Sequence, residues 1–206
     1  MYSKHQWLQV AQRLQSIAQA GLTYAESGYD LERYHQIMGI SKDIITGYTT
    51  MTMEKVNRIF DGETGYLTPK VDVRGLVFRG NQLLFVRETV DGRWSLPGGW
   101  ADVGYSPSEM VEKEVIEEAG LTVTATRLLA VLDKKCHPHP PDLYYVYKFF
   151  FLCEETGGEL RTSIETSEVG FFGLDNLPEL SEPRNTRSQI ELMYRLKNEL
   201  NGTLFD

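Results

Sequence analysis

The hydrophobic pattern of this chain changes its period near Val71, and this change limits the folds that the chain can adopt. Before it, apolar residues recur three and four positions apart, as on one face of a helix, at Trp7, Ala11, Leu14 and Ala18. After it, apolar residues alternate with a period of two, as in strands. We therefore predict an α/β fold with two domains, a small N-terminal helical module at 1–66 and a sheet with helices on its faces at 67–206.

The N-terminal module is expected to contain short helices. The first begins at a capping-box pattern on Ser3 and stops near Gly21. The second, capped by Asp30, is expected to break at Gly39 and to restart at Ser41. A short third helix follows. Because short helices gain stability mainly by packing, we expect the module to form a homodimer or to shape a substrate pocket.

The second domain is expected to alternate strands and helices. Strands are predicted at 71–78, 82–87, 121–135, 143–153 and 169–172. The fourth of these is apolar on both faces, which indicates a central strand covered on both sides. A closing helix has an apolar stripe of Ile190, Met193, Leu196 and Leu200.

The composition excludes several classes of protein. A net charge of −8 argues against an extended nucleic-acid surface, although an RNA end as substrate stays open. No stretch approaches the roughly 20 apolar residues of a membrane span, so we expect no membrane association. The two cysteines, Cys136 and Cys153, form no disulfide framework, which favours a cytoplasmic location. Cys136 and the histidines after it do not have zinc-ligand spacing, so a stiff loop is the better interpretation.

One helix in the second domain has well-marked ends. Ser106 is an N-cap, Pro107 suits the first helical position, and Glu109 completes a capping box. Gly120 supplies the C-terminal stop after Ala119. The sequence therefore predicts a helix from Pro107 to about Ala119.

This helix gathers acidic side chains at its C-terminal end. Glu114, Glu117 and Glu118 lie three and four positions apart, where like charges cost about 0.2–0.5 kcal/mol per pair. The helix macrodipole disfavours them as well. A solvated acidic face would explain these residues alone. The flexible pair Gly98 and Gly99 just before the helix favours a bound divalent cation instead, since Mg²⁺ prefers oxygen ligands.

The stretch from Gly99 to Leu121 resembles the Nudix box. Gly99, Glu114, Val115, Glu117, Glu118, Gly120 and Leu121 fall in register with it. Tyr105 stands where the box has its first glutamate, and Lys113 stands where it has arginine. The strands at 71–78 and 83–87 and the segment 167–178 also resemble the family. The resemblance implies an α/β/α sandwich with a mixed sheet and a Mg²⁺-dependent hydrolase, with Mn²⁺ as an alternative ion.

The likeness extends to a bacterial subgroup of ADP-ribose or CDP-choline pyrophosphatases with an N-terminal helical module. It implies hydrolysis of a nucleoside diphosphate linked to a group X, a small-molecule substrate, into a nucleoside monophosphate and phospho-X. Hydrolysis of nucleoside triphosphates or RNA ends is an alternative within the family. A non-catalytic nucleotide sensor is another alternative, although all three glutamates are retained.

The resemblance also suggests roles for particular residues. Glu114 and Glu118 are the expected principal metal ligands, and the Gly98 carbonyl completes the site. Glu117 is either a third ligand or the group that takes the proton of water, and Glu118 and Glu168 are further catalytic candidates.

Substrate-binding roles are expected for three residues. Gly99 lets its backbone approach the substrate, and Arg74 and Arg87 could bind phosphate oxygens. Ordinary salt bridges would explain the two arginines equally well. A surface position would explain Glu168 as well as a catalytic one.

Overall fold

The computed structural model describes residues 3–199 and 202–206, which divide into two compact units. The first unit comprises Met1–Pro69 together with Pro141–Tyr145, and the second comprises Lys70–Pro140 together with Val146–Asp206. The short segment 141–145 joins the first unit because the Gln12 amide donates to the carbonyls of Asp142 and Leu143, at 2.9 and 3.1 Å. Nothing in the sequence pattern predicts this assignment.

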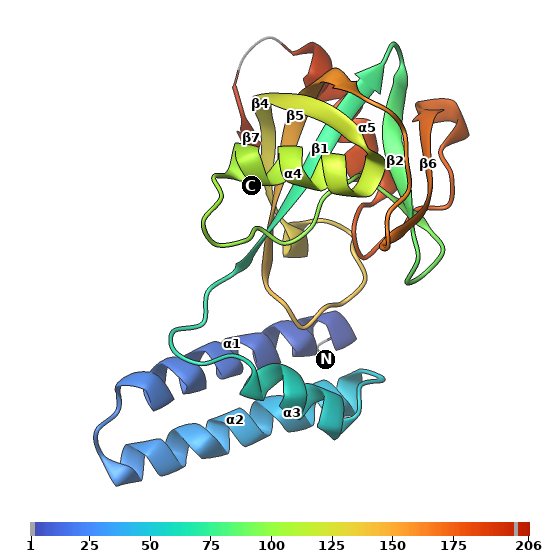
Figure 1. The fold of residues 1–206 in the computed structure, drawn as a ribbon. Coiled ribbons are helices and arrows are strands. Elements are labelled where there is room, and N and C mark those ends of the chain that lie inside the picture. Colours follow the sequence, from blue (N-terminus) through green and yellow to red (C-terminus); the bar gives the residue numbers. More distant parts are fainter. Residues whose placement is uncertain (1–2, 200–201) are drawn as a thin grey trace. The chain divides into compact units, whose positions relative to one another are not determined.

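The described part of the first unit contains the helices α1 (Lys4–Tyr24), α2 (Gly28–Tyr48) and α3 (Met53–Asp61) (Figure 1). The predicted capping box on Ser3 is present. The predicted break at Gly39 is wrong, since α2 is continuous. A glycine inside a helix costs only about 1 kcal/mol and removes no backbone hydrogen bond. Ser41 caps nothing. It is buried, and its hydroxyl donates to the Ala11 carbonyl at 2.8 Å, joining α2 to α1.

The second unit is built on one mixed sheet. Its strands are β1 (Lys70–Arg79), β2 (Gln82–Glu88), β3 (Trp94–Ser95), β4 (Leu121–Asp133), β5 (Val146–Gly158), β6 (Thr166–Gly173) and β7 (Leu204–Phe205). The order is β3-β2-β1-β5-β4-β7, and β6 pairs with β2. β1 is parallel to β5 and β4 to β7, whereas the other pairings are antiparallel. β5 is central, as predicted, but it begins at Val146 rather than at 143.

Helices α4 (Pro107–Ala119) and α5 (Arg187–Asn198) cover opposite faces of this sheet (Figure 1). The face under α4 buries Val73, Val77, Val111, Val115 and Phe151. The face under α5 buries Leu76, Phe85, Phe150, Ile190 and Met193. This confirms the predicted α/β/α arrangement. Leu200, which was expected in the last apolar stripe, lies outside the described residues.

The loop after β3 replaces β2 along half of β1. β2 pairs with β1 only near the hairpin, at Phe78 and Arg79. Upstream, the loop 97–101 lies along β1 through three hydrogen bonds of 2.9 Å, which are Gly75 N–H to Pro97 O, Val73 N–H to Gly99 O, and Ala101 N–H to Val71 O. The edge of β1 therefore holds the Gly-Gly loop directly before α4.

No helix in the described part of the chain has both the length and the hydropathy that a membrane crossing requires. Two short 3₁₀ turns, at Lys134–Cys136 and Leu174–Asn176, complete the secondary structure of the described residues.

Candidate active site

The ends of α4 lie where local capping predicts them. The Ser106 hydroxyl accepts from the Glu109 N–H at 3.3 Å, and the Glu109 carboxylate accepts from the Ser106 N–H at 2.8 Å. Gly120 ends the helix with φ +77°, a conformation that L side chains rarely adopt. These caps fix which face of the helix the glutamates occupy.

Two of these glutamates face the Gly-Gly loop. Glu118 is 5% exposed, and its Oε2 accepts a hydrogen bond from the Gly98 N–H at 2.8 Å. A Cβ at Gly99 would lie 3.3 Å from Glu114 Oε2. Gly98 has φ +139°, and a Cβ there would lie 2.0 Å from the Val73 carbonyl oxygen. At position 98, only glycine can therefore carry the loop this close to β1, and the small size of Gly99 lets the loop lie beside the Glu114 carboxylate.

Burial makes the negative charge of both glutamates unfavourable. It raises the pKa of Glu118 to about 8, and the rise is opposed by Arg74 and the Gly98 N–H and increased by the carboxylate of Glu114. Burial likewise raises the pKa of Glu114 to about 7, against the charges of Arg74 and Lys113. The two carboxyl groups thus share a place where added positive charge would be favourable.

This pair suits a divalent cation. Among residues 3–199 and 202–206, no three His, Cys, Asp or Glu side chains are grouped closely enough to hold a metal by themselves. Mg²⁺ is commonly bound by only one or two carboxylates, with waters and substrate phosphates as its other ligands. The carboxylate oxygens of Glu114 and Glu118 are hard donors and lack a full counter-charge, so they fit such an ion.

Glu117 is not gathered with the other two. Its side chain is 56% exposed, and its Oε2 lies 3.2 Å from Lys113 Nζ. Lys113 also lies 3.4 Å from Asp102 Oδ2. The expected roles of Glu117, as third ligand or proton acceptor, stay predictions that require Lys113 to release it.

Arg74 is buried rather than exposed to substrate. Its guanidinium binds the Asp72 carboxylate with two hydrogen bonds, and Nη1 donates to the Leu96 carbonyl at 2.9 Å. Its charge still acts on Glu114 and Glu118, whose pKa values it lowers. The expected phosphate contact of Arg74 stays a prediction, and these bonds favour a role inside the fold.

Arg87 and Glu168 pair with each other. Arg87 Nη1 forms an ion pair with Glu168, and its Nε donates to the Gly92 carbonyl at 2.7 Å. Glu168 lies on β6, which begins at Thr166 and not at 169 as predicted. Since both side chains are largely exposed, the ordinary salt bridge is the arrangement that these contacts favour.

Glu165 is a further acidic residue whose charge acts on Glu114 of α4, and the sequence pattern predicted no role for it. The Thr166 hydroxyl donates to the Glu118 carbonyl at 2.8 Å, which ties the turn before β6 to the end of α4. The charge of Glu165 raises the pKa of Glu114, whereas Glu168 faces Arg87. No local sequence signal distinguishes the two glutamates, because the difference depends on how this turn meets α4.

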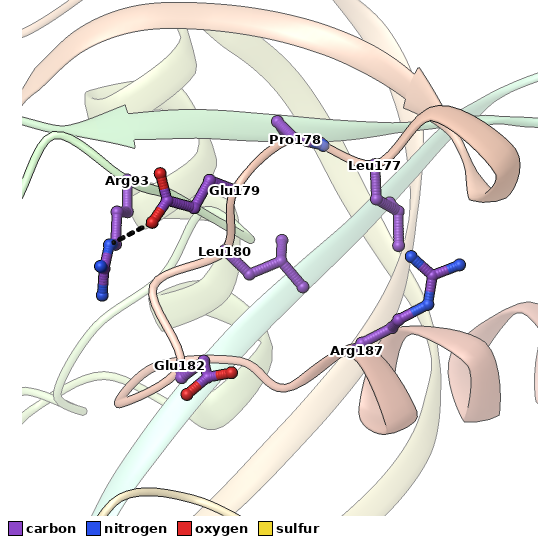
Figure 2. A pocket seen from close by; sticks show the side chains of 7 residues that line it. All are labelled: Arg93, Leu177, Pro178, Glu179, Leu180, Glu182 and Arg187. Atoms are coloured by element: carbon purple, nitrogen blue, oxygen red, sulfur yellow. Dashed lines mark ion pairs between the residues drawn. The ribbon is translucent and has the colours of Figure 1, made fainter.

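The second unit also has a cavity of about 340 Å³ beside α5 (Figure 2). It is lined by Arg93, Leu177, Pro178, Glu179, Leu180, Glu182 and Arg187. None of the predicted site residues lines it. The Arg93–Glu179 ion pair of 3.0 Å crosses one side of the cavity, so these two charges compensate each other.

Comparisons with known proteins match both parts of the chain. Residues 5–60 match the family described as the UDP-X-like N-terminal oligomerisation domain, and residues 68–196 match the NUDIX domain. The protein YjhB of Bacillus subtilis, whose name provisionally assigns it as an ADP-ribose pyrophosphatase, is 47% identical over 97% of either chain. An ADP-ribose pyrophosphatase of Methanocaldococcus jannaschii is 33% identical over 56% of this chain and 69% of its own.

Two solved structures have the same fold. A UDP-X diphosphatase superposes over all of both chains with a TM-score of 0.65 and 31% identity. An ADP-ribose pyrophosphatase from Streptococcus suis gives a TM-score of 0.62 and 45% identity over 68% of this chain and all of its own. The NUDIX match alone spans more than half of the sequence. The chain therefore belongs to the Nudix hydrolase family, as the glutamates of its capped helix predicted.

Proposed function

We propose that this enzyme hydrolyses the pyrophosphate bond of a nucleoside diphosphate linked to a group X, in a reaction that depends on a divalent metal. The products are a nucleoside monophosphate and phospho-X. The observation that carries the proposal is the pair of carboxylates of buried Glu118 and half-buried Glu114, set against a loop that Gly98 and Gly99 bring close to both.

The names of the relatives support the choice of substrate. They include ADP-ribose pyrophosphatases and a UDP-X diphosphatase, which share a nucleoside diphosphate and differ in base and in the attached group. We therefore propose ADP-ribose and UDP-linked compounds as the first candidates, and CDP-choline as another member of the same chemical class.

The three glutamates near the C-terminal end of α4 would each have a role in the reaction. Glu114 and Glu118 would hold the divalent ion, Mg²⁺ or Mn²⁺. When bound, the ion would neutralise phosphate charge and lower the pKa of a coordinated water. The Gly98 N–H keeps the Glu118 carboxylate in place, since it donates to Oε2. In the reaction, the oxygen of water forms a bond to one phosphorus, the bridging P–O bond breaks, and a carboxylate such as Glu117 accepts the proton of water.

Metal-dependent turnover tests the proposal. ADP-ribose, UDP-sugars, CDP-choline and nucleoside triphosphates would be incubated with the enzyme and Mg²⁺ or Mn²⁺, with EDTA as the metal-free condition. We expect one class of nucleoside diphosphate–X to be preferred. Glu118→Gln should lower kcat by about 10³-fold, since it removes a charged ligand. Glu191→Gln is the matched control, because Glu191 is an exposed helical glutamate of α5 that pairs with Arg187.

The alternatives are separate outcomes of the same panel. Preference for triphosphates would replace the proposed substrate class. Tight nucleotide binding without turnover would favour a sensor, and normal activity of Glu118→Gln would contradict the proposed role of the pair.

We also propose that residues 1–66 act in homodimer formation. Support comes from the match of residues 5–60 to a domain described as an oligomerisation domain. Light scattering of the purified protein measures the state directly, and a monomer at micromolar concentration would overturn it. We further propose that the enzyme acts in the cytoplasm. The free thiols of Cys136 and Cys153 support this location.

A further inference from the structure

Three charged side chains of β1 and β5 are buried together, on the face of these strands that points away from α4. Asp72 accepts from Arg74 Nε at 3.0 Å and Nη2 at 2.6 Å, and from Lys148 Nζ at 2.5 Å. The exposed fractions are 5% for Asp72, 4% for Arg74 and 1% for Lys148. Two cations thus share one carboxylate inside the protein.

Burying such a cluster does not by itself stabilise a fold. The cost of removing charges from water offsets much of their attraction, and apolar residues of similar size often serve stability as well or better. The cluster instead fixes the orientation of the Arg74 guanidinium. A guanidinium bound to a carboxylate by two parallel hydrogen bonds has a fixed plane, so its remaining Nη1 points one way.

That remaining donor holds the entrance to the Gly-Gly loop. Arg74 Nη1 donates to the Leu96 carbonyl at 2.9 Å, and the Leu96 N–H donates to Asn185 Oδ1 at 3.0 Å. Both backbone polar groups of Leu96 are therefore fixed by buried side chains from other elements. Two residues later, the Gly98 N–H meets the Glu118 carboxylate.

We infer that Asp72 and Arg74, supported by Lys148, are positioning residues that hold the 96–99 segment against Glu118. The inference rests on the proposed function for its catalytic consequence. It assigns Arg74 to the loop rather than to a phosphate of the substrate, because Nε, Nη1 and Nη2 are all engaged by protein groups. Asp72 then acts on catalysis without touching the substrate.

Arg74→Lys is the most direct test. Lysine keeps the positive charge beside Asp72 but loses the fork that reaches Leu96. Asp72→Asn is the second variant, since it removes the charge that orients Arg74. Glu155→Gln is the matched control, because the Arg79–Glu155 pair joins the same two strands at their other end.

The first measurement is amide hydrogen exchange of Leu96 and of residues 98–101 in the metal-free, substrate-free protein. We expect both variants to exchange faster in this loop by about tenfold or more, as for a segment released from its tertiary hydrogen bonds. Glu155→Gln should exchange as the wild type does. Unchanged protection of the loop in folded Arg74→Lys and Asp72→Asn would overturn the inference.

The second measurement separates kcat from KM. A loop displaced by about 1 Å can lower the rate about 100-fold, so we expect kcat to fall by that order with KM changed by less than about threefold. A raised KM with normal kcat and normal loop exchange in Arg74→Lys would instead identify Arg74 as a phosphate ligand. If the wild type itself turned over no substrate, the proposed function would fail, whereas the exchange measurement would still decide the positioning role.

Discussion

Lys113 Nζ lies 5.5 Å from the centroid of the Tyr105 ring, so the two positions at which this chain departs from the Nudix box are in contact. The Nudix box has glutamate and arginine at these two positions, and such a pair could form an ion pair. In this chain a cation–π contact takes the place of that ion pair. Lys113 also forms ion pairs with Asp102 and Glu117. The departures therefore compensate each other and leave Glu117 bound to a lysine.

Removing this lysine should strengthen metal binding. Lys113→Met takes away a positive charge that lowers the pKa of Glu114, and it releases Glu117. We expect the dissociation constant for Mn²⁺ to fall about threefold, as for the loss of a partly exposed charge. Isothermal titration of the substrate-free protein measures it. Lys113→Arg keeps the charge and should bind Mn²⁺ as the wild type does. Weaker binding by Lys113→Met would contradict this account.

Without metal, Glu118→Gln should stabilise the protein in a pH-dependent way. The pKa values of Glu114 and Glu118 are raised from 4.5 to about 7 and about 8, respectively. At pH values between the ordinary and the raised pKa, the folded chain therefore binds more protons than the unfolded chain. The associated stability is fully present below about pH 4.5 and is lost as the pH rises through 7 to 8.

Glutamine stays neutral, so this variant avoids its share of that loss. We expect its advantage in unfolding free energy to grow from near zero at pH 5 to on the order of 2 kcal/mol at pH 8. Denaturant unfolding in EDTA measures it, and Glu191→Gln should show no such trend. An advantage that shrank with rising pH would have the wrong sign.

The two loop glycines should differ in their tolerance of a methyl group. A Cβ at Gly98 would lie 2.0 Å from the Val73 carbonyl oxygen at φ +139°, whereas a Cβ at Gly99 would lie 3.3 Å from a carboxylate oxygen that can move. We expect Gly98→Ala to cost about 3 kcal/mol of stability and nearly all activity. Gly99→Ala should fold normally with a smaller loss of kcat. Thermal unfolding and turnover would separate them, and equal effects would contradict the geometry.

Glu165 and Glu168 offer another comparison. Glu165 acts electrostatically on Glu114, whereas Glu168 pairs with Arg87. We expect Glu165→Gln to lower kcat about tenfold, as for the loss of a group that supports a metal ligand. Glu168→Gln should stay within about twofold, as for loss of an exposed ion pair. Steady-state kinetics of the two variants checks the order, and the reverse order would restore the sequence-based role of Glu168.

The predicted bounds of α4 match the observed ones because its ends depend on neighbours three residues apart, as between Ser106 and Glu109. The break at Gly39 fails for the opposite reason. Ser41 looks like a helix start, but its hydroxyl partner is Ala11, thirty residues away. Likewise, no local pattern shows that Lys148 on β5 will meet Asp72 on β1. What depends on tertiary pairing could not be predicted from spacing alone.

The segment 141–145 has a consequence for how the two units can be separated. It lies between the 3₁₀ turn Lys134–Cys136 and β5 in the sequence but belongs to the helical unit, where Leu143 is 7% exposed and shares a core with Leu8 and Ile45. A truncation that began at residue 67 would leave Leu143 without that core and its carbonyl without Gln12. Truncation at residue 67 would therefore not remove the helical unit cleanly. Grafting it onto another Nudix domain would require transplanting five residues from the middle of the chain as well.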